Sequence, residues 1–97
     1  MAAYLLFIRD EPVHDQAEMD EYQRMNRERG SDGFDVKRLA FYGAADALEG
    51  PVPDGVVVLE FPTVEEARGW YQSPGYQAAM QHRLKAASYR VIVVEGV

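Results

Sequence analysis

Apolar and polar residues follow two different patterns along the chain. Four short apolar runs, residues 2–9, 34–42, 55–62 and 89–96, are rich in β-branched and aromatic side chains. Two longer segments, 14–30 and 63–87, carry apolar residues at helical spacing. The pattern therefore predicts four strands and two helical segments, with the Gly- and Pro-rich stretch GAADALEGPVPDG as a loop between the second and third strands.

The first helical segment has both a start signal and a stop signal. Asp15 is a suitable N-cap with Glu18 three residues later, which is a variant of the capping box. Gly30 suits the position that follows the last helical residue. We expect a helix between these signals, with a buried stripe that includes Ala17, Tyr22 and Met25.

The second helical segment contains a break. Thr63 and Glu66 form a second capping box, and the helix that they start is expected to end near Gln72. Ser73 and Pro74 can restart it, because serine is a good N-cap and proline is favoured at the first helical position. The restarted helix carries an apolar stripe of Tyr76, Ala79, Met80, Leu84 and Ala87.

The order β-α-β-β-α-β predicts a single α+β domain over residues 1–97. It is the ferredoxin-like pattern, in which a four-stranded antiparallel sheet carries both helices on one face. The runs 4–8, 56–59 and 91–94 are apolar on both faces, whereas a sheet with one face in water alternates more strictly. We therefore expect a second copy of the chain to cover the open face, giving a homodimer.

The residues after position 55 resemble a known family. VVVLEFPTVEEARGWYQSPGYQAAMQHRLKAASYRVIVVEG is similar to the DUF1330 family of the dimeric α/β-barrel superfamily, and the likeness extends to YGAADALEG and AYLLFI. It implies a ferredoxin-like fold, a face-to-face sheet dimer and a small cleft between helices and sheet. Relatives in the superfamily include cofactor-free monooxygenases, muconolactone-type isomerases and polyketide cyclases. DUF1330 itself has no generally assigned activity, so the resemblance implies a fold more than a function.

Two segments depart from the family's pattern. The residue after Ser73 and Pro74 is usually acidic in such proteins and is Gly75 here, so no role of that acid is carried over. The segment RDEPVHDQAEMDEY, residues 9–22, replaces a short Asp-Pro entry, and the mouth of the cleft is expected to differ there.

Charge and cysteine content exclude several classes of function. The net charge is −6, from 16 acidic and 10 basic residues, and no Lys/Arg cluster offsets it. Nucleic acids and anionic membrane surfaces are therefore poor partners. The absence of cysteine excludes thiol catalysis and disulfides. No signal-peptide pattern opens the chain, and AAYLLFI is too short to cross a bilayer, so we expect a cytoplasmic location.

Arg83 is the most informative single residue. It lies seven residues after Tyr76, on the apolar stripe of the last helix. A guanidinium directed at a core must find an acid, a carbonyl or a ligand anion. One interpretation pairs Arg83 with a carboxylate of the protein. The other makes it an anchor for the carboxylate or enolate of a bound small molecule.

Four more residues could take part in chemistry. Glu60 and Arg38 interrupt neighbouring strands, where they form either a cross-strand ion pair or, for Glu60, a buried general base. Of the two histidines, His82 is expected to be half-exposed, and His14 is either a solvated loop residue or a general base at the mouth of the cleft. No spacing of His and carboxylates predicts a metal site.

Aromatic residues on the helices, Tyr22, Trp70, Tyr71 and Tyr76, either fill the core or line a cleft for a flat ligand. No nucleotide-binding, flavin-binding or serine-nucleophile motif is present, so no cofactor is expected.

The leading hypothesis is a small cofactor-independent enzyme that isomerises, cyclises or oxygenates a carbonyl-bearing organic molecule. The roles in this hypothesis are an oxyanion anchor (Arg83), hydrogen-bond donors (Tyr22, Tyr76), a proton carrier (Glu60 or His14) and further substrate contacts (Tyr76, Trp70, Arg38). The alternatives are a non-catalytic protein that binds a small molecule in the same cleft and a structural dimer without a cleft.

Overall fold

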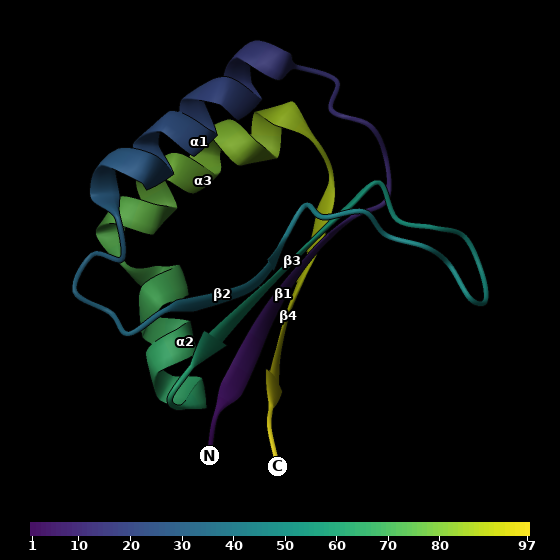
Figure 1. Cartoon of the computed structure of the whole chain (residues 1–97). Helices are drawn as coiled ribbons and strands as arrows, with labels where there is room; N and C mark the ends of the chain where they lie inside the picture. The colour runs from purple at the N-terminus through teal and green to yellow at the C-terminus, as the bar shows by residue number, and fades with distance from the viewer.

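The computed structural model describes all of residues 1–97 and contains one antiparallel sheet with three helices on one of its faces (Figure 1). The strands, in the spatial order β2-β3-β1-β4, are β1 (Ala3–Arg9), β2 (Lys37–Phe41), β3 (Gly55–Phe61) and β4 (Tyr89–Glu95). The helices are α1 (Gln16–Arg29), α2 (Val64–Gln72) and α3 (Pro74–Ala86). The predicted ferredoxin-like order is confirmed, with the second helical segment divided into α2 and α3.

Local capping signals start and end the helices as the sequence predicts. The side chain of Asp15 accepts a hydrogen bond from the Glu18 N–H at 3.2 Å, and Thr63 Oγ1 accepts one from the Glu66 N–H at 3.1 Å. Gly30 has a φ of +61°, a left-handed value that glycine adopts without a steric penalty. Both capping boxes therefore position the first turns of α1 and α2.

Ser73 joins α2 to α3, but its hydroxyl does not cap α3 as predicted. Ser73 Oγ instead donates to the Trp70 carbonyl at 2.6 Å, and so satisfies one of the free carbonyls at the end of α2. The Gln77 side-chain amide donates to the Tyr71 carbonyl at 2.7 Å. Pro74 stands in the first turn of α3, as expected. The break is therefore fixed from both sides.

The buried faces of the helices differ in detail from the predicted stripes. In α1 the buried residues are Met19 and Tyr22, whereas Ala17 is exposed, because α1 packs on α3 and only the side facing α3 and the sheet is covered. In α3 Arg83 is on the buried face as predicted, but Leu84 is exposed. One step along a helix turns a side chain by about 100°, which separates these neighbours.

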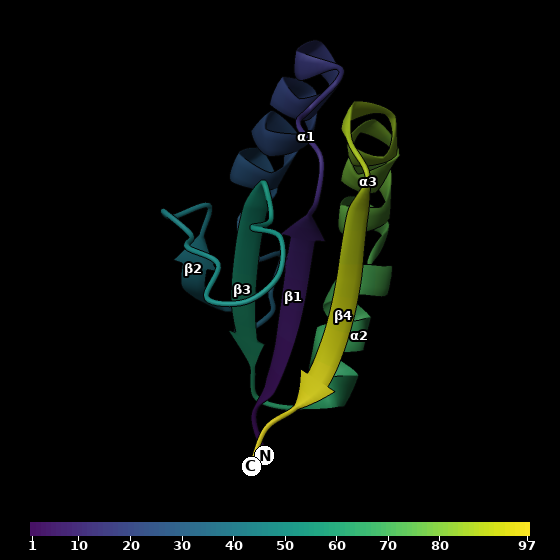
Figure 2. The ribbon, with the colours of Figure 1, turned by 90° about the vertical axis from the view of Figure 1, so that its right-hand side faces the viewer.

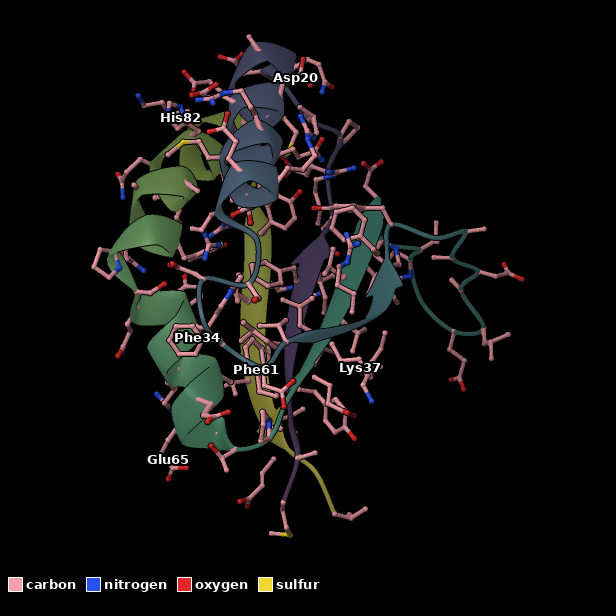
Figure 3. All side chains as sticks on the ribbon, turned by 60° about the vertical axis from the view of Figure 1, so that its left-hand side comes forward. Asp20, Phe34, Lys37, Phe61, Glu65 and His82 are labelled. Atoms are coloured by element: carbon pink, nitrogen blue, oxygen red, sulfur yellow. The ribbon has the colours of Figure 1, made fainter.

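The second strand is shorter than the predicted run 34–42. Phe34 precedes it and lies over α2, with its ring 3.3 Å from the point where a side chain at Gly69 would begin (Figure 3). Phe34 therefore fills the space beside α2 and contributes to the core from a turn.

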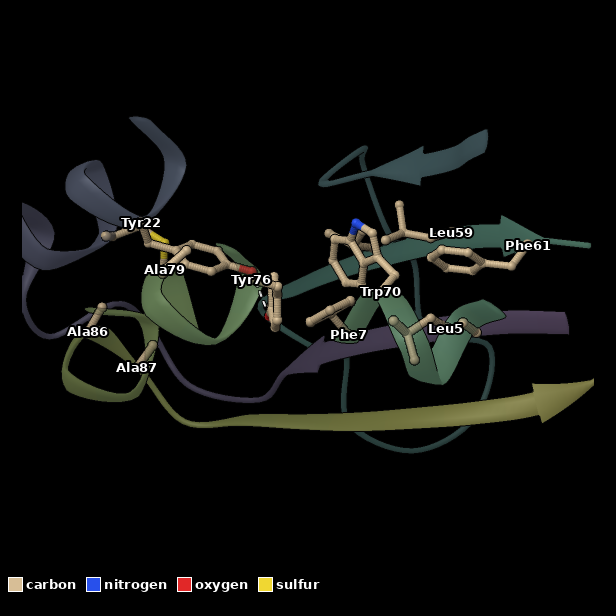
Figure 4. Packing of buried hydrophobic residues seen from close by; sticks show 13 residues of the cluster. Leu5, Phe7, Tyr22, Leu59, Phe61, Trp70, Tyr76, Ala79, Ala86 and Ala87 are labelled. Carbon is tan, nitrogen blue, oxygen red and sulfur yellow. Dashed lines mark hydrogen bonds between the residues drawn. The ribbon is translucent and has the colours of Figure 1, made fainter. Parts of the chain in front are cut away.

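The core lies between the sheet and the helices (Figure 4). The Phe7 ring meets the Trp70 ring edge to face, with their centroids 6.3 Å apart, and the Trp70 and Tyr76 centroids are 4.4 Å apart. Aliphatic residues of the central strands, including Leu5 and Leu59, complete the layer. The sequence did not decide whether the helical aromatic residues fill the core or line a cleft. In the structure their rings form one packed cluster, which consists of Tyr22, Trp70, Tyr71 and Tyr76.

No helix covers the opposite face of the sheet (Figure 2). Cross-strand neighbours on this face include Val58, Leu6 and Ile92, which form a continuous apolar row. Ile92 is 43% exposed and Val94 is 48% exposed. The prediction that the strands are apolar on both faces is confirmed.

None of the helices combines the length and the apolar composition needed to cross a lipid bilayer.

Candidate functional site

A cavity of about 670 Å³ lies between the C-terminal half of α1 and the helix-facing side of β2 and β3. Its wall includes Tyr22 and Arg29 from α1, Arg38 from β2, Tyr42 from the following loop and Trp70 from α2. The volume falls within the range that small-molecule sites occupy. Helix α1 packs on α3 and not on the edge strand β2, whose residues are all exposed. This arrangement leaves space between α1 and this edge of the sheet.

Two tyrosines form a buried pair at the wall of the cavity. The hydroxyls of Tyr22 and Tyr76 are 2.9 Å apart, and their rings meet edge to face. Burial is the main cause that raises the pKa of both phenols above the ordinary value. Both hydroxyls therefore stay protonated, and Tyr22, which lines the cavity, can donate a hydrogen bond to a ligand.

Arg83 lies behind Tyr76 and has no acidic partner. Its residue is 3% exposed, its Nε has no hydrogen-bond partner, and no carboxylate lies within 4.0 Å of it. Its guanidinium carbon is 5.2 Å from the centroid of the Tyr89 ring and 5.9 Å from that of Phe7. Burial raises the pKa of Tyr76, and the positive charge of Arg83 partly offsets this increase.

Arg83 does not line the 670 Å³ cavity but a shallower hollow of about 420 Å³ beside β4, which Tyr89 and Tyr71 also line. Of the two interpretations, pairing with a protein carboxylate is not what the structure shows. Arg83 can act on the larger cavity through Tyr76, whose hydroxyl it faces and which in turn contacts Tyr22.

A second tyrosine pair reaches the same cavity and was missed by sequence reasoning. The hydroxyls of Tyr42 and Tyr89 are 2.7 Å apart, and Arg9 Nη1 donates to the Tyr89 hydroxyl at 2.9 Å. Arg9 is in turn paired with Asp54 at 3.0 Å. Burial raises the pKa of Tyr42 well above its usual range, so this phenol is also a hydrogen-bond donor.

Tyr42 is held in an unusual backbone conformation. Its φ is +54°, which is rare for a bulky residue. A Cβ at Gly55 would lie 2.8 Å from the Tyr42 ring, so the ring occupies space that only glycine leaves free. The sequence shows that tyrosines stand at the ends of strands, but it does not show the positive φ of Tyr42. The contact between Tyr42 and Tyr89 could therefore not be predicted from the sequence.

Arg29 is a further cavity residue that sequence reasoning missed. Its guanidinium carbon is 5.3 Å from the Trp70 ring centroid and 5.5 Å from that of Tyr76. A Cβ at position 75 would lie 2.5 Å from Arg29 Cδ and 2.8 Å from Asp32 Oδ2. Gly75, where the family resemblance implied an acidic residue, thus leaves room for Arg29 and the neighbouring carboxylate.

The structure brings together four of the predicted site residues and separates the others. Tyr22, Trp70 and Arg38 line the cavity, and Tyr76 supports it from behind. Glu60 lies between the buried Leu59 and Phe61 in β3, so it points to the open face of the sheet, where the Lys37 Nζ is 3.9 Å from its carboxylate. Arg38 is opposite the buried Leu59 and points to the other face. The predicted Glu60–Arg38 ion pair is therefore wrong.

The two histidines also lie outside both cavities. His14 is exposed in the loop before α1, where its backbone N–H donates to the Ala86 carbonyl at 2.9 Å. His82 is half-buried, as predicted, and its Nδ1 is 2.6 Å from Glu18 Oε2. No three His, Asp or Glu side chains come together in a group that could hold a metal ion.

Solved structures with the same fold come from several bacteria. A protein of unknown function from Rhodopseudomonas palustris matches with a TM-score of 0.66 and 19% identity over 99% of this chain and 82% of that one. An EthD-family protein from Bacillus halodurans matches with a TM-score of 0.63 and 16% identity over the whole of both chains. A dimeric ferredoxin-like protein of unknown function from Bacteroides fragilis has a TM-score of 0.60 and 11% identity, covering 98% and 96% of the two chains. At such identities the likeness shows the fold alone.

A search of curated proteins finds no match. The model of the family described as "Domain of unknown function (DUF1330)" matches residues 2–97, which is nearly the entire chain. The segments that resemble this family in the sequence, from AYLLFI to the closing VIVVEG, all lie inside that match. The chain therefore belongs to the DUF1330 family.

Proposed function

We propose that the 670 Å³ cavity binds a small carbonyl-bearing organic molecule and that the protein is a cofactor-independent enzyme acting on it by isomerisation, cyclisation or oxygenation. The observation that carries the proposal is that two hydrogen-bonded tyrosines, Tyr22 and Tyr42, line a largely apolar cavity. Each hydroxyl is backed by a second tyrosine and then by an arginine.

These hydroxyls suit a ligand oxygen that becomes negative during a reaction. Because their phenols stay protonated, they can donate to an enolate oxygen without first losing a proton. Arg83 behind Tyr76 and Arg9 behind Tyr89 supply fixed positive charge in a site of low polarity, where such donors are worth more than in water. Isomerisation, cyclisation and cofactor-free oxygenation all pass through such an anion.

The cavity wall contains no side chain suited to remove a proton from the substrate. No Asp, Glu or His lines it, and Glu60 and His14 lie elsewhere. In the proposed reaction the carbon-bound proton therefore leaves to water, while the tyrosines stabilise the oxygen. This same observation favours a second candidate, a protein that binds the molecule without converting it.

Deuterium exchange separates the two candidates. The wild-type protein is incubated in D₂O with 2-acetylnaphthalene, a flat methyl ketone, and deuterium uptake at the methyl carbon is followed by NMR. Catalysis predicts exchange faster than in buffer, and at least tenfold slower exchange for Tyr22→Phe, since one oxyanion donor is commonly worth that much or more. Saturable binding with exchange no faster than in buffer would contradict the enzyme and support the binding protein.

Arg83→Met tests the role of the buried cation. Methionine roughly preserves the volume, so the variant is expected to fold, and its exchange rate should fall at least tenfold if Arg83 supports the tyrosine pair. Arg68→Met, on the exposed side of α2, is the matched control. An unchanged rate in the Arg83 variant would remove Arg83 from the mechanism.

The proposal also includes assembly into a homodimer through the uncovered sheet face. Similar structures from Bacteroides fragilis and Thermobifida fusca are described as dimeric. Here the support is the apolar face formed by residues such as Leu6, Val58 and Ile92, which no helix covers. A second copy of the same sheet is complementary to it under two-fold symmetry.

A further inference from the structure

We infer that the molecule bound in the cavity carries a carboxylate, and that Arg29 and Arg38 hold this group at the end of the cavity lined by the last turn of α1 and by β2. The inference rests on the proposed function, because it uses the same cavity, and it names the chemical class of the ligand.

The charge of the cavity wall is opposite to that of the whole molecule. The chain has a net charge of −6, yet the wall contains three arginines, Arg27, Arg29 and Arg38, and no Asp or Glu. The wall therefore attracts an anion, in contrast to the net negative charge of the chain.

Arg29 is the buried member of this group. Its side chain is 10% exposed, and its Nε and Nη1 are buried without a hydrogen-bond partner. Its only contacts with oxygen are a hydrogen bond from Nη2 to Asn26 Oδ1 at 2.9 Å and an ion pair with the half-exposed Asp32 at 3.6 Å. A guanidinium that is removed from water and incompletely paired stabilises an anion placed beside it.

Arg38 is the accessible member. It is exposed, its guanidinium carbon is 5.1 Å from the Phe41 ring centroid, and it forms no ion pair or side-chain hydrogen bond within the chain. Its N–H groups are therefore free for the two-pronged contact that arginine makes with carboxylates.

The position of Arg38 excludes a purely local explanation. Arginines in the last turn of a helix interact with the free carbonyls there, and this could account for Arg27 and Arg29 by themselves. Arg38 belongs to a strand, and the register turns it toward the helix-facing side of the sheet and into the same cavity.

The rest of the wall defines the ligand beyond its carboxylate. Apolar residues, among them Phe7, Val57 and Trp70, offer a surface for a flat body, and the hydroxyls of Tyr22 and Tyr42 offer donors to a second oxygen. The ligand class is therefore an aromatic or conjugated carboxylate with a separate carbonyl group.

Calorimetric titration of the full-length protein with matched probes tests this inference. The probes are 2-naphthoate and 2-naphthamide, which share shape and differ in charge. We expect saturable binding of 2-naphthoate at least tenfold tighter than that of 2-naphthamide, and at least tenfold weaker binding of 2-naphthoate by Arg38→Gln and Arg29→Gln. Arg68→Gln, outside the cavity, should bind like the wild type.

The possible outcomes test separately whether the cavity binds a ligand and whether it prefers a carboxylate. Equal affinity for both probes, or unchanged binding by Arg38→Gln, would overturn the carboxylate inference and leave the proposed cavity in place. Binding of neither probe would contradict both. Arg38 is exposed, so its variant provides a folded test even if Arg29→Gln, which removes packing on Trp70, does not fold.

Discussion

The Tyr22–Tyr76 pair links packing, charge and chemistry in two side chains. Tyr76 is completely buried, and its hydroxyl lies between the Tyr22 hydroxyl and the charge of Arg83. A buried hydroxyl that loses its partner costs more free energy than the bond itself contributes, whereas removing both hydroxyls costs little. The pair therefore has a measurable signature in folding that does not depend on knowing a substrate.

A double-mutant cycle on this pair should be strongly non-additive. We expect Tyr22→Phe and Tyr76→Phe each to lower the free energy of unfolding by about 1–3 kcal/mol, because each removes the hydrogen bond between the two buried hydroxyls. The double variant should lose clearly less than the sum, as measured by urea unfolding. Additive losses would show that the two hydroxyls do not interact in solution.

The raised pKa values of Tyr22, Tyr42 and Tyr76 predict a loss of stability at high pH. In the unfolded chain these phenols ionise near pH 10, whereas in the folded protein they keep their protons. Their contribution is complete below pH 10 and decreases above it, by about 1.4 kcal/mol per pH unit for each phenol. Absorbance at 295 nm during alkaline titration should show two of the six tyrosines, Tyr22 and Tyr42, ionising only on unfolding, and Tyr76 ionising at a higher pH than an exposed tyrosine. Ionisation of all six near pH 10 in the folded protein would contradict the burial of these hydroxyls.

At the level of single residues, the sequence indicated the site only in part. The helical spacing placed Tyr76 and Arg83 on one buried face, and that position is confirmed. Arg29 was not predicted as a site residue, because its contacts with Trp70 and Tyr76 join segments that are far apart in the chain. Glu60 was expected beside Arg38, but pairing one residue further along put them on opposite faces, since side chains alternate along a strand.

Among the elements, the junction of α2 and α3 controls where the aromatic cluster lies. Trp70 lies in the last turn of α2, Tyr76 lies in the first turn of α3, and their ring centroids are 4.4 Å apart across the break. The junction is held by hydrogen bonds to the last carbonyls of α2 from Ser73 and Gln77. Its geometry therefore sets the wall of the cavity.

Substitution by aspartate distinguishes the two possible roles of Ser73. An N-cap accepts a hydrogen bond, and aspartate does this well, whereas the observed bond to the Trp70 carbonyl needs a donor. Ser73→Asp should therefore lower the free energy of unfolding by about 1–2 kcal/mol. Thr63→Asp, at the N-cap of α2, should change it by less than about 0.5 kcal/mol, because Thr63 Oγ1 accepts its bond. Equal, small effects in both variants would show that Ser73 acts as an N-cap after all.

The order of helices and strands was predictable, because it depends on local capping and turn residues that can be identified in the sequence. The capping boxes at Asp15 and Thr63 and the left-handed Gly30 appear as expected. Tyr22 and Met25 lie on the core side of α1 as predicted, but the exact edge of the buried face was not predictable, since it depends on where α3 lies against α1 and therefore on tertiary packing. The same dependence makes Met19 a core residue and leaves Ala17 exposed.

For the whole molecule, the sheet has two faces of different character. One face carries the core and the cavity, and the other is apolar, extended and free of helices (Figure 2). Contiguous apolar surface of this kind marks an interaction site in small proteins. The cavity and the proposed dimer interface therefore occupy opposite sides of the same four strands.

A charge on the open face should dissociate the proposed dimer. Ile92→Glu places a carboxylate at the β4 end of the apolar row, and desolvating it in an interface is unfavourable. Light scattering should give twice the mass of one chain for the wild type and the mass of a single chain for the variant. Leu48→Glu, on a loop where Leu48 is 93% exposed, is the control and should stay dimeric. A monomeric wild type would refute the dimer.

The central claim is that the cavity between α1 and the sheet is the functional site. A crystal structure of the protein soaked with 2-naphthoate tests it most directly. We expect the naphthalene ring to lie against Trp70, with its carboxylate at Arg38 and Arg29. Ligand bound only beside Arg83 in the smaller hollow, or a cavity closed by movement of α1 with no ligand inside, would contradict it.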